Sequence, residues 1–374
     1  MSLFRHALSR LSEDLLLTIL LVALIPLLWL TEEPTWALHQ LVDWKTVGAL
    51  AGLMVLSRGL EVSGYLTLAG QWLLQRIHSE RRLAISLILF SGGLSAVITN
   101  DVALFIVVPL TLGLRTVAQL PVGRLIIFEA LAVNAGSAIS PIGNPQNLFL
   151  WQASGAGFVE FTLVMAPLAL ALMALLIAAV PLAFPGKRIA VTDVPLVITR
   201  HRQLFWVSLL LYIPFLVLTE WGYAAPAAAA VILLTLCYQR HILLGVDWLL
   251  LLVFVLMFIN LNLLAGLPVM AELAGHLLQL PGEVFTAGVL SSQVMSNVPA
   301  AIFLYAFTDD WQTLAWGVSV GGFGLAIGSL ANLIALRLAR QPGLWREFHY
   351  WALPALLGGC LIAALLMGLQ RGWL

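Results

Sequence analysis

Long apolar stretches, interrupted at a few points by polar residues, dominate the pattern along the chain. A helix needs about 20 apolar residues to cross a hydrocarbon layer of roughly 30 Å, and several stretches approach or exceed that length. The stretches are continuous instead of alternating, which disfavours a membrane β-barrel. The expected membrane spans are 15–30, 46–63, 124–151, 161–184, 203–219, 224–238, 246–264, 311–337 and 350–370.

Composition strengthens this prediction. Hydrophobic residues make up 61% of the 374 residues and charged residues 10%, whereas soluble domains contain roughly 45–50% apolar residues. We therefore expect an all-α polytopic membrane protein. The formal net charge of zero offers no basic surface for nucleic acid. Cys237 and Cys360 both lie in apolar stretches, so neither a disulfide framework nor a metal quartet is expected. We expect no cofactor, and no metal beyond possible sodium.

Lysine and arginine in short loops favour the cytoplasmic side of a membrane. This rule predicts a cytoplasmic N-terminus, a periplasmic C-terminus, and acidic or neutral loops on the outside. The basic residues expected inside are Arg5, Arg10, Arg76, Arg81, Arg82, Arg115, Arg124, Lys187, Arg188, Arg200, Arg202, Arg240, Arg337, Arg340 and Arg346.

Two segments have the form of hairpins that enter the membrane and turn back. Segment 83–114 lies between arginines, so both its ends favour the cytoplasm, and it is broken in the middle at Thr99-Asn100-Asp101. Each arm would hold about 13 to 16 residues, which reaches mid-membrane at about 1.5 Å per residue. Segment 284–308 has the same form around "MSNVPAA", but acidic residues flank it and place it on the opposite side.

The chain also contains internal repeats. "VDW" at 42 matches "VDW" at 246, "SAVITNDVA" at 95 matches "SQVMSNVPA" at 292, and "VNAGSAISPIGNPQNLFLW" at 133 matches "VSVGGFGLAIGSLANLIAL" at 318. Because the two "VDW" segments lie on opposite sides by the charge rule, we predict two inverted repeats, 1–190 and 200–374, with broken helices at 124–151 and 311–337. Such repeats are typical of secondary transporters whose site lies between them.

Helix breaks at membrane depth need partners for their free backbone groups. A helix that begins there presents N–H donors and partial positive charge to an anion. The carbonyls of a helix that ends there, with side-chain oxygens, suit sodium. The residues expected to bind the anion are Thr99, Asn100, Asn144, Asn147, Ser296, Asn297, Ser329 and Asn332. Those expected at the coupling cation are Asp101, Asn100, Asn297, Gly143 and Gly328.

Asp101 is the only acid at these breaks, and Val298 occupies its place in the second repeat. A carboxylate inside a membrane usually marks function, as a cation ligand or a proton carrier. It can also cap the helix that follows, and both interpretations stay open. The asparagines can equally satisfy freed backbone, and glycine more often serves close helix packing.

Two further acids, Glu61 and Glu129, lie within predicted membrane spans. Glu61 lies one helical turn from Arg58, which predicts a local ion pair. Glu129 has no evident partner in the sequence, and pairing with Arg58 is a hypothesis. The segments 65–78 and 267–280 precede the hairpins, are moderately amphipathic, and are expected to lie along the interfaces.

The strings "TNDVALFIVVPL", "SNVPAAIFL", "ISPIGNPQN" and "IGSLANLIAL" resemble the ion transporter superfamily, in its arsenite permease and sodium/proton antiporter branch. With "ERRLA", "RLIIFEALAVNAGS" and "VDWLLLLVF", the likeness extends to bacterial inner-membrane anion permeases of the YbiR type. The resemblance implies an elevator mechanism, in which a transport domain moves against a scaffold, and a homodimer. It assigns 83–184 and 284–370 to the transport domain.

The resemblance also bears on the substrate. Dicarboxylate relatives carry Ser-Asn-Thr at each hairpin tip, and this chain lacks the final Thr in both repeats, whereas arsenite permeases share Asn100, Asp101, Asn297 and Pro299. We therefore expect a transporter of a small anion or oxyacid, coupled to sodium or protons. The alternative is a sodium/proton antiporter on the same fold. An intramembrane hydrolase is a remote alternative, because the sequence has no HExxH motif and no histidine in the middle of a span.

Overall fold

A computed structural model describes residues 15–31, 33–74, 77, 79–114, 120–189 and 200–370. Over these residues the protein is helical, and Ser79 and Arg188 form an isolated antiparallel bridge. Both chain ends, and Arg5, Arg10, Arg76 and Arg115 of the predicted cytoplasmic segments, lie outside the described residues.

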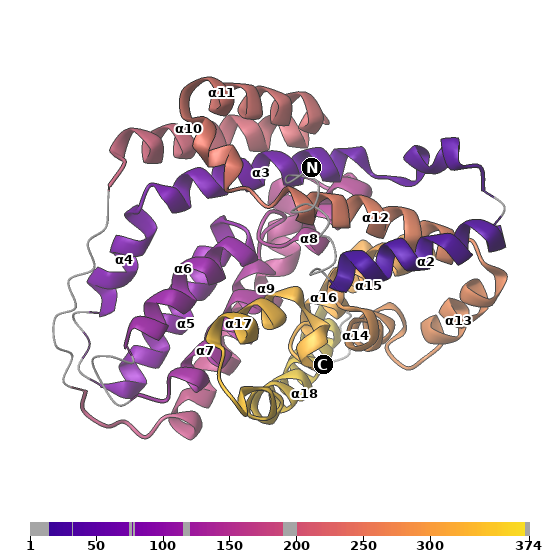
Figure 1. The fold of residues 1–374 in the computed structure, drawn as a ribbon. Coiled ribbons are helices and arrows are strands. Elements are labelled where there is room, and N and C mark those ends of the chain that lie inside the picture. Colours follow the sequence, from indigo (N-terminus) through magenta and orange to yellow (C-terminus); the bar gives the residue numbers. More distant parts are fainter. Residues whose placement is uncertain are drawn as a thin grey trace.

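One group of helices surrounds α3 (Trp44–Val62). It contains α2 (Leu15–Thr31), α10 (Arg202–Glu220), α11 (Ala224–Leu244) and α12 (Trp248–Ala265). Figure 1 shows α10 and α11 stacked over α3, on the side away from α5, α6 and α7, while α12 packs along α2. Gly52 permits the contact between α3 and α10, because a Cβ at this position would overlap the ring of Phe215.

The other group forms the larger part of the protein. It contains α5 (Glu80–Val97), α6 (Asn100–Gly113), α7 (Val122–Ser137), α8 (Pro145–Ser154), α9 (Phe158–Ala183), α14 (Glu283–Met295), α15 (Asn297–Tyr305), α16 (Trp311–Gly321), α17 (Leu330–Ala339) and α18 (Leu344–Gln370). Two close helix pairs organise it, α5 with α7 and α14 with α16. In the first pair Gly136 lies against the backbone of Gly92, where a Cβ would overlap the Gly92 carbonyl. This is the packing use of glycine expected from the sequence.

Two short helices connect the groups. Helix α4 (Tyr65–Leu74) follows α3 at a bend of 57° and packs against α6, and α13 (Pro268–Leu278) packs against α12 and α14. They occupy the segments expected to precede the hairpins. Two 3-10 helices complete the described chain, η1 (Thr35–Leu41) and η3 (Ala326–Gly328).

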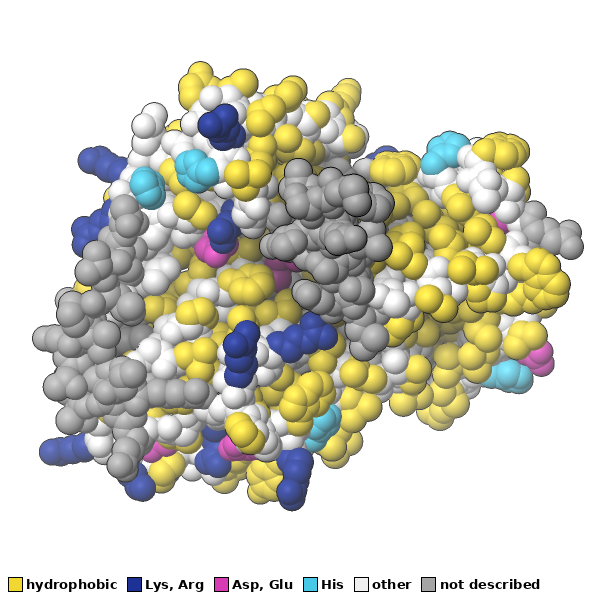
Figure 2. All heavy atoms as spheres, viewed as in Figure 1, with side chains coloured by type: hydrophobic (Ala, Val, Ile, Leu, Met, Phe, Trp, Pro, Cys, Tyr) yellow, Lys and Arg dark blue, Asp and Glu magenta, His cyan; other side chains and the backbone are white. Residues whose placement is uncertain are grey.

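Several helices have the length and apolarity of membrane spans. Among the described residues, α9, α10, α11, α12 and α18 each qualify alone, and up to seven spans result if two bent helix pairs are counted as one span each. Their outer faces expose large apolar side chains such as Leu182, Ile213 and Leu361. Figure 2 shows hydrophobic side chains over much of the visible face, with most Lys and Arg on its left-hand half. The protein is therefore a polytopic membrane protein, as the apolar stretches predict.

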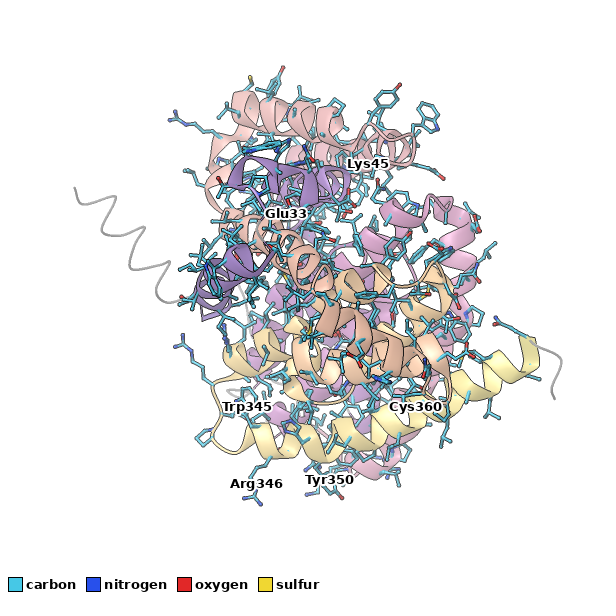
Figure 3. All side chains as sticks on the ribbon, turned by 90° about the vertical axis from the view of Figure 1, so that its right-hand side faces the viewer. Glu33, Lys45, Trp345, Arg346, Tyr350 and Cys360 are labelled. Atoms are coloured by element: carbon cyan, nitrogen blue, oxygen red, sulfur yellow. The ribbon has the colours of Figure 1, made fainter. Side chains whose placement is uncertain are left out.

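The ends of α5, α7, α9 and α18 meet where arginines cap α9. The last carbonyls of a helix lack partners within the helix. Here Arg81 Nε donates to Phe184 O at 2.9 Å and Arg124 Nη1 donates to Ala183 O at 2.7 Å. Arg124 also pairs with Glu347 of α18 at 2.7 Å. Figure 3 shows α18 running across the molecule, with Trp345, Arg346 and Tyr350 near one end and Cys360 farther along.

Candidate functional site

The break between α5 and α6 is anchored to the next helix break. Helix α5 ends at Val97, and Thr99 is the N-cap residue of α6. The Asn100 N–H donates to Gly143 O at 2.9 Å, and the Asn100 side chain accepts from the Asp101 N–H at 2.9 Å. Gly143 can approach so closely because it has no side chain; a Cβ there would lie 2.8 Å from Ser95 O. The first hairpin tip is therefore fixed by backbone contacts.

The break between α14 and α15 turns at a strained residue. Ser296 has φ 75° and ψ 157°, a conformation that costs a residue with a side chain about 1–3 kcal/mol. Gln293 holds the nearby chain, since its Nε2 donates to Gly321 O at 2.6 Å and its Oε1 accepts from the Leu325 N–H at 2.6 Å. The second tip is thus attached to the break that follows α16.

Asparagines close the break between α7 and α8. Asn144 caps α8 by accepting from the Asn147 N–H at 2.9 Å, with Pro145 at the first helical position. Asn147 Nδ2 donates to Ala138 O at 2.9 Å and Ser140 O at 3.2 Å. These side chains bond backbone that left the helix, which is the structural role left open for them by the sequence.

The break between α16 and α17 is held from the other half of the chain. Ser329 caps α17, and Asn332 Nδ2 donates to Gly322 O at 2.9 Å. Asn134 of α7 completes the network: its Nδ2 donates to Asn332 Oδ1 at 2.8 Å, and its Oδ1 accepts from the Ser329 hydroxyl at 2.9 Å. Asn134 was not among the predicted site residues, although it aligns with the polar Ser319 in the repeat and lies in an apolar helix.

Four helices begin around one small cavity, which we call the central cavity. It has a volume of about 40 Å³ and is lined by Leu50, Met54, Asn100, Asp101, Pro145, Leu250, Phe254, Asn297, Val298, Ser329, Leu330, Ala331 and Ile334. The cavity touches the first turns of α6, α8, α15 and α17. Helix N-termini carry partial positive charge. Some first-turn N–H groups here already have acceptors: Gly143 O and Asn100 Oδ1 at α6, Asn144 Oδ1 at α8, and the Ser329 hydroxyl at α17. The convergence of the four N-termini creates a site suited to an anion.

The structure separates the predicted site residues into two sets. Asn100, Asp101, Asn297 and Ser329 line the central cavity. The others are not in its lining and instead cap the helix starts or bond the chain at the breaks: Thr99, Ser296, Asn144, Asn147, Asn332, Gly143 and Gly328. The first set can touch a solute, and the second shapes the backbone that would bind it.

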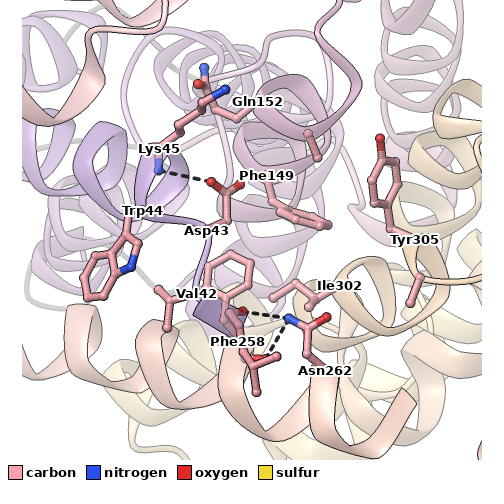
Figure 4. A pocket seen from close by; sticks show the side chains of 13 residues that line it. Val42, Asp43, Trp44, Lys45, Phe149, Gln152, Phe258, Asn262, Ile302 and Tyr305 are labelled. Atoms are coloured by element: carbon pink, nitrogen blue, oxygen red, sulfur yellow. Dashed lines mark hydrogen bonds between the residues drawn. The ribbon is translucent and has the colours of Figure 1, made fainter. Parts of the chain in front are cut away.

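Two larger pockets flank the central cavity. The first, the Arg58 pocket, has about 230 Å³ and is lined by Met54, Arg58, Glu61, Asp101, Val102, Phe105, Gly245, Val246 and Asp247. The second, the Lys45 pocket, has about 500 Å³ and is lined by Leu41, Val42, Asp43, Trp44, Lys45, Phe149, Gln152, Ala153, Phe258, Asn262, Ile302, Tyr305 and Ala306. Figure 4 shows Lys45 and Gln152 at one end of the Lys45 pocket, with Tyr305 and Asn262 away from them.

Helices α3 and α12 border all three spaces. Along α3, Asp43 lines the Lys45 pocket, Leu50 the central cavity and Arg58 the Arg58 pocket. Along α12 the order is reversed, from Asp247 in the Arg58 pocket to Phe258 in the Lys45 pocket. Asp101 and Met54 line both the central cavity and the Arg58 pocket. The three spaces therefore follow one another along a single pair of helices.

Two predicted ion pairs have different outcomes. Arg58 Nη1 lies 2.6 Å from Glu61 Oε1, which confirms the local pair. The hypothesis that Arg58 pairs with Glu129 is wrong. Glu129 is fully buried and accepts a hydrogen bond from the hydroxyl of Thr111 on α6. Arg58 instead pairs on its own helix and faces the Arg58 pocket.

Similarity to known proteins shows the family of the chain. A family model described as "Citrate transporter" matches residues 8–321. The chain belongs to this citrate transporter family. The inner membrane protein YbiR of Escherichia coli is 46% identical over 333 residues, covering 87% of this chain and 88% of YbiR. An uncharacterized transporter of Methanocaldococcus jannaschii is 32% identical over 304 residues, covering 80% and 82%.

A more distant match supports the same assignment. A putative transporter arsB of Dictyostelium discoideum is 27% identical over 122 residues, covering 33% of this chain and 22% of that protein. Together these findings confirm the resemblance to the ion transporter superfamily. The protein is a membrane transporter and not an enzyme, so the intramembrane hydrolase is no longer a candidate.

Proposed function

We propose that this protein is a secondary active transporter that moves a small anion or oxyacid across the bacterial inner membrane, coupled to sodium or protons. One observation carries the proposal: the first turns of α6, α8, α15 and α17 meet at the central cavity. Each helix N-terminus acts as roughly half a positive charge. Four of them together attract an anion although the lining has no lysine or arginine, and they are opposed by one negative charge when Asp101 is ionised.

The lining favours a small solute. Its polar groups are the amides of Asn100 and Asn297, the hydroxyl of Ser329 and the single acid Asp101. A volume of about 40 Å³ accommodates about three water-sized groups at roughly 10–15 Å³ each. We therefore favour an inorganic oxyanion, an uncharged oxyacid or a single carboxylate group over a bulky tricarboxylate such as citrate.

The two flanking pockets support the inverted repeats. With the repeat alignment of the sequence, six residues of the Lys45 pocket correspond to six residues of the Arg58 pocket. Leu41, Val42, Asp43, Phe258, Asn262 and Ile302 correspond to Gly245, Val246, Asp247, Met54, Arg58 and Phe105. We infer that these pockets are the two access routes to the central cavity, one from each side of the membrane.

The helix packing supports an elevator motion. We assign 83–184 and 284–370 to the moving domain, and the group around α3 to the scaffold. Helices α4 and α13 would act as arms between them. We also expect a homodimer, as the resemblance implies, with the N-terminus in the cytoplasm. The concentration of Lys and Arg on one side of Figure 2 supports such an orientation.

Transport assays with purified full-length protein in liposomes test this function. We would supply arsenite, inorganic oxyanions, small carboxylates and citrate in turn, under a sodium or a proton gradient. Wild type should accumulate at least one small anion or oxyacid. Asn100→Ala and Asn297→Ala should reduce that flux about tenfold or more, as for the loss of a hydrogen bond to a charged group. Asn260→Ala, which removes a buried amide of α12 that lines none of the three spaces, is the matched control. Equal flux in all variants would refute the site.

A second candidate is a sodium/proton antiporter that uses Asp101. It is favoured by the Arg58 pocket, which contains Glu61, Asp101 and Asp247 against the single cation Arg58. Release of protons from wild type on addition of sodium, without any dependence on anions, would support this candidate and exclude anion transport.

A further inference from the structure

Arg58 has a donor that its present partner does not use. Its Nη1 bonds Glu61 at 2.6 Å, while its Nε is buried and has no hydrogen-bond partner within the described chain. The same pocket contains Asp101 and Asp247. A guanidinium offers five donors in a rigid fork and is always charged, so it binds carboxylates in pairs of hydrogen bonds. Arg58 is therefore incompletely paired in a pocket that contains other carboxylates.

The pocket leaves Arg58 room to move. Its guanidinium lies against the backbone of Gly245, where a Cβ would be 2.7 Å from Nε and 2.8 Å from Nη2. Because Gly245 has no side chain, the guanidinium can lie against its backbone and still line the space of about 230 Å³ that Asp101 also lines. Val102, Phe105 and Val246 form apolar walls, which strengthen attraction between opposite charges.

The second repeat has no charged residue at the positions that correspond to Arg58, Glu61 and Asp101. Asn262, Ala265 and Val298 stand at these positions. The remaining acid of the pocket is present in both repeats and has a structural explanation. Asp247 accepts from the Leu250 N–H at 3.2 Å and caps α12, and Asp43 caps α3 in the same way. Helix capping thus accounts for Asp43 and Asp247 but leaves the joint occurrence of Arg58, Glu61 and Asp101 unexplained.

We propose that Arg58 is a built-in cation that binds Asp101 when the coupling ion has left and returns to Glu61 when that ion binds. The inference rests on the proposed coupling role of Asp101. An unpaired carboxylate at membrane depth is costly, and a guanidinium that replaces the missing cation removes that cost. The empty carrier can then return across the membrane. In the structure Arg58 pairs with Glu61, and Asp101 has no ion-pair partner among the described residues, so sodium or a proton can bind it.

The test measures how strongly the coupling cation stabilises the purified full-length protein. Thermal unfolding is followed in a sodium titration at fixed pH and in a pH titration without sodium. Because Arg58 competes with the cation, Arg58→Gln should lower the cation concentration at half-maximal stabilisation by about tenfold. Glu61→Gln releases Arg58 toward Asp101 and should raise that concentration. Arg58→Lys, which keeps the charge, should stay closer to wild type.

Two controls separate this inference from the proposed function. Lys45→Gln removes the basic side chain of the other flanking pocket and should leave the midpoint unchanged. Asp101→Asn should abolish the cation response in every background. If wild type responds normally and Arg58→Gln and Glu61→Gln keep its midpoint, the inference is refuted and coupling through Asp101 stands. If wild type shows no response to sodium or to pH, coupling through Asp101 is refuted and the inference with it.

Discussion

Asn134→Ala should destabilise the protein strongly although Asn134 does not line the central cavity. The substitution removes the acceptor of the Ser329 hydroxyl and the donor to Asn332 Oδ1, whose bonds are 2.9 and 2.8 Å long. Both partners are almost fully buried, at 1% and 0% exposure. A buried polar group left unpaired costs about 1–3 kcal/mol. The expected loss is therefore about 2–6 kcal/mol in the free energy of unfolding.

Ser319→Ala is a matched control for this prediction. Ser319 aligns with Asn134 in the second repeat and is also buried, but its hydroxyl has no partner among the described residues. Removing an unpaired buried hydroxyl should be neutral or stabilising. Both variants are compared with wild type by reversible unfolding in mixed detergent micelles, followed by tryptophan fluorescence.

The same two variants test whether the hydrogen bonds of Asn134 support anion binding in the central cavity. Ser329 lines the central cavity, so releasing its hydroxyl in Asn134→Ala should also weaken stabilisation by a bound anion. Ser319→Ala should keep that stabilisation. An unfolding free energy of Asn134→Ala within about 0.5 kcal/mol of wild type, the range of an ordinary surface substitution, would contradict this prediction. A Ser319→Ala variant that loses as much stability as Asn134→Ala would contradict it as well.

Three further predictions each concern a single feature of the site or its surroundings. Ser296→Gly removes a backbone strain of about 1–3 kcal/mol, while the greater freedom of glycine in the unfolded chain costs roughly 0.5–1 kcal/mol. The unfolding temperature of this variant should therefore equal or exceed that of wild type. A lower unfolding temperature would refute the strain. Thr111→Val leaves an oxygen of Glu129 without its hydrogen-bond donor and should lower the free energy of unfolding by about 1–3 kcal/mol. Glu129→Gln keeps an acceptor for the Thr111 hydroxyl and should cost less. The reverse order of unfolding free energies would contradict this. Gly143→Ala places a Cβ against Ser137 and should sharply reduce the yield of monodisperse protein, so a normal yield and unfolding temperature would count against the close approach.

The helix breaks could be predicted because a break inside a membrane needs particular residues, whereas helix ends were less exact, since α18 begins at Leu344 and not at 350. Ser, Thr, Asn, Gly and Pro within apolar stretches marked the breaks before α6 at Asn100 and α15 at Asn297. The direction of each side chain could not be predicted. Asn144 and Asn147 have the same chemistry as Asn100, yet they bond the backbone of a break, because an amide serves either purpose and only the local geometry decides.

Long-range partners were also beyond sequence reasoning. Asn134 lies inside the continuous helix α7, so no break signals it, and its partners Ser329 and Asn332 come from the other half of the chain. Glu129 illustrates the same limit. Its hypothetical partner was the charged residue Arg58, but the packing of α6 against α7 supplies the hydroxyl of Thr111 instead.

Side-specific labelling shows whether the central cavity opens to each side of the membrane in turn. In a chain whose Cys237 and Cys360 are replaced by serine, Val298→Cys is treated with a membrane-impermeant, negatively charged thiol reagent in vesicles of either orientation. Phe105→Cys in the Arg58 pocket and Ile302→Cys in the Lys45 pocket serve as markers for the two sides. Each marker should react from one side of the membrane only, and the two markers should react from opposite sides. Position 298 should react from both sides. A cysteine at 298 that reacts from neither side, while both markers react, would contradict a central anion site with alternating access.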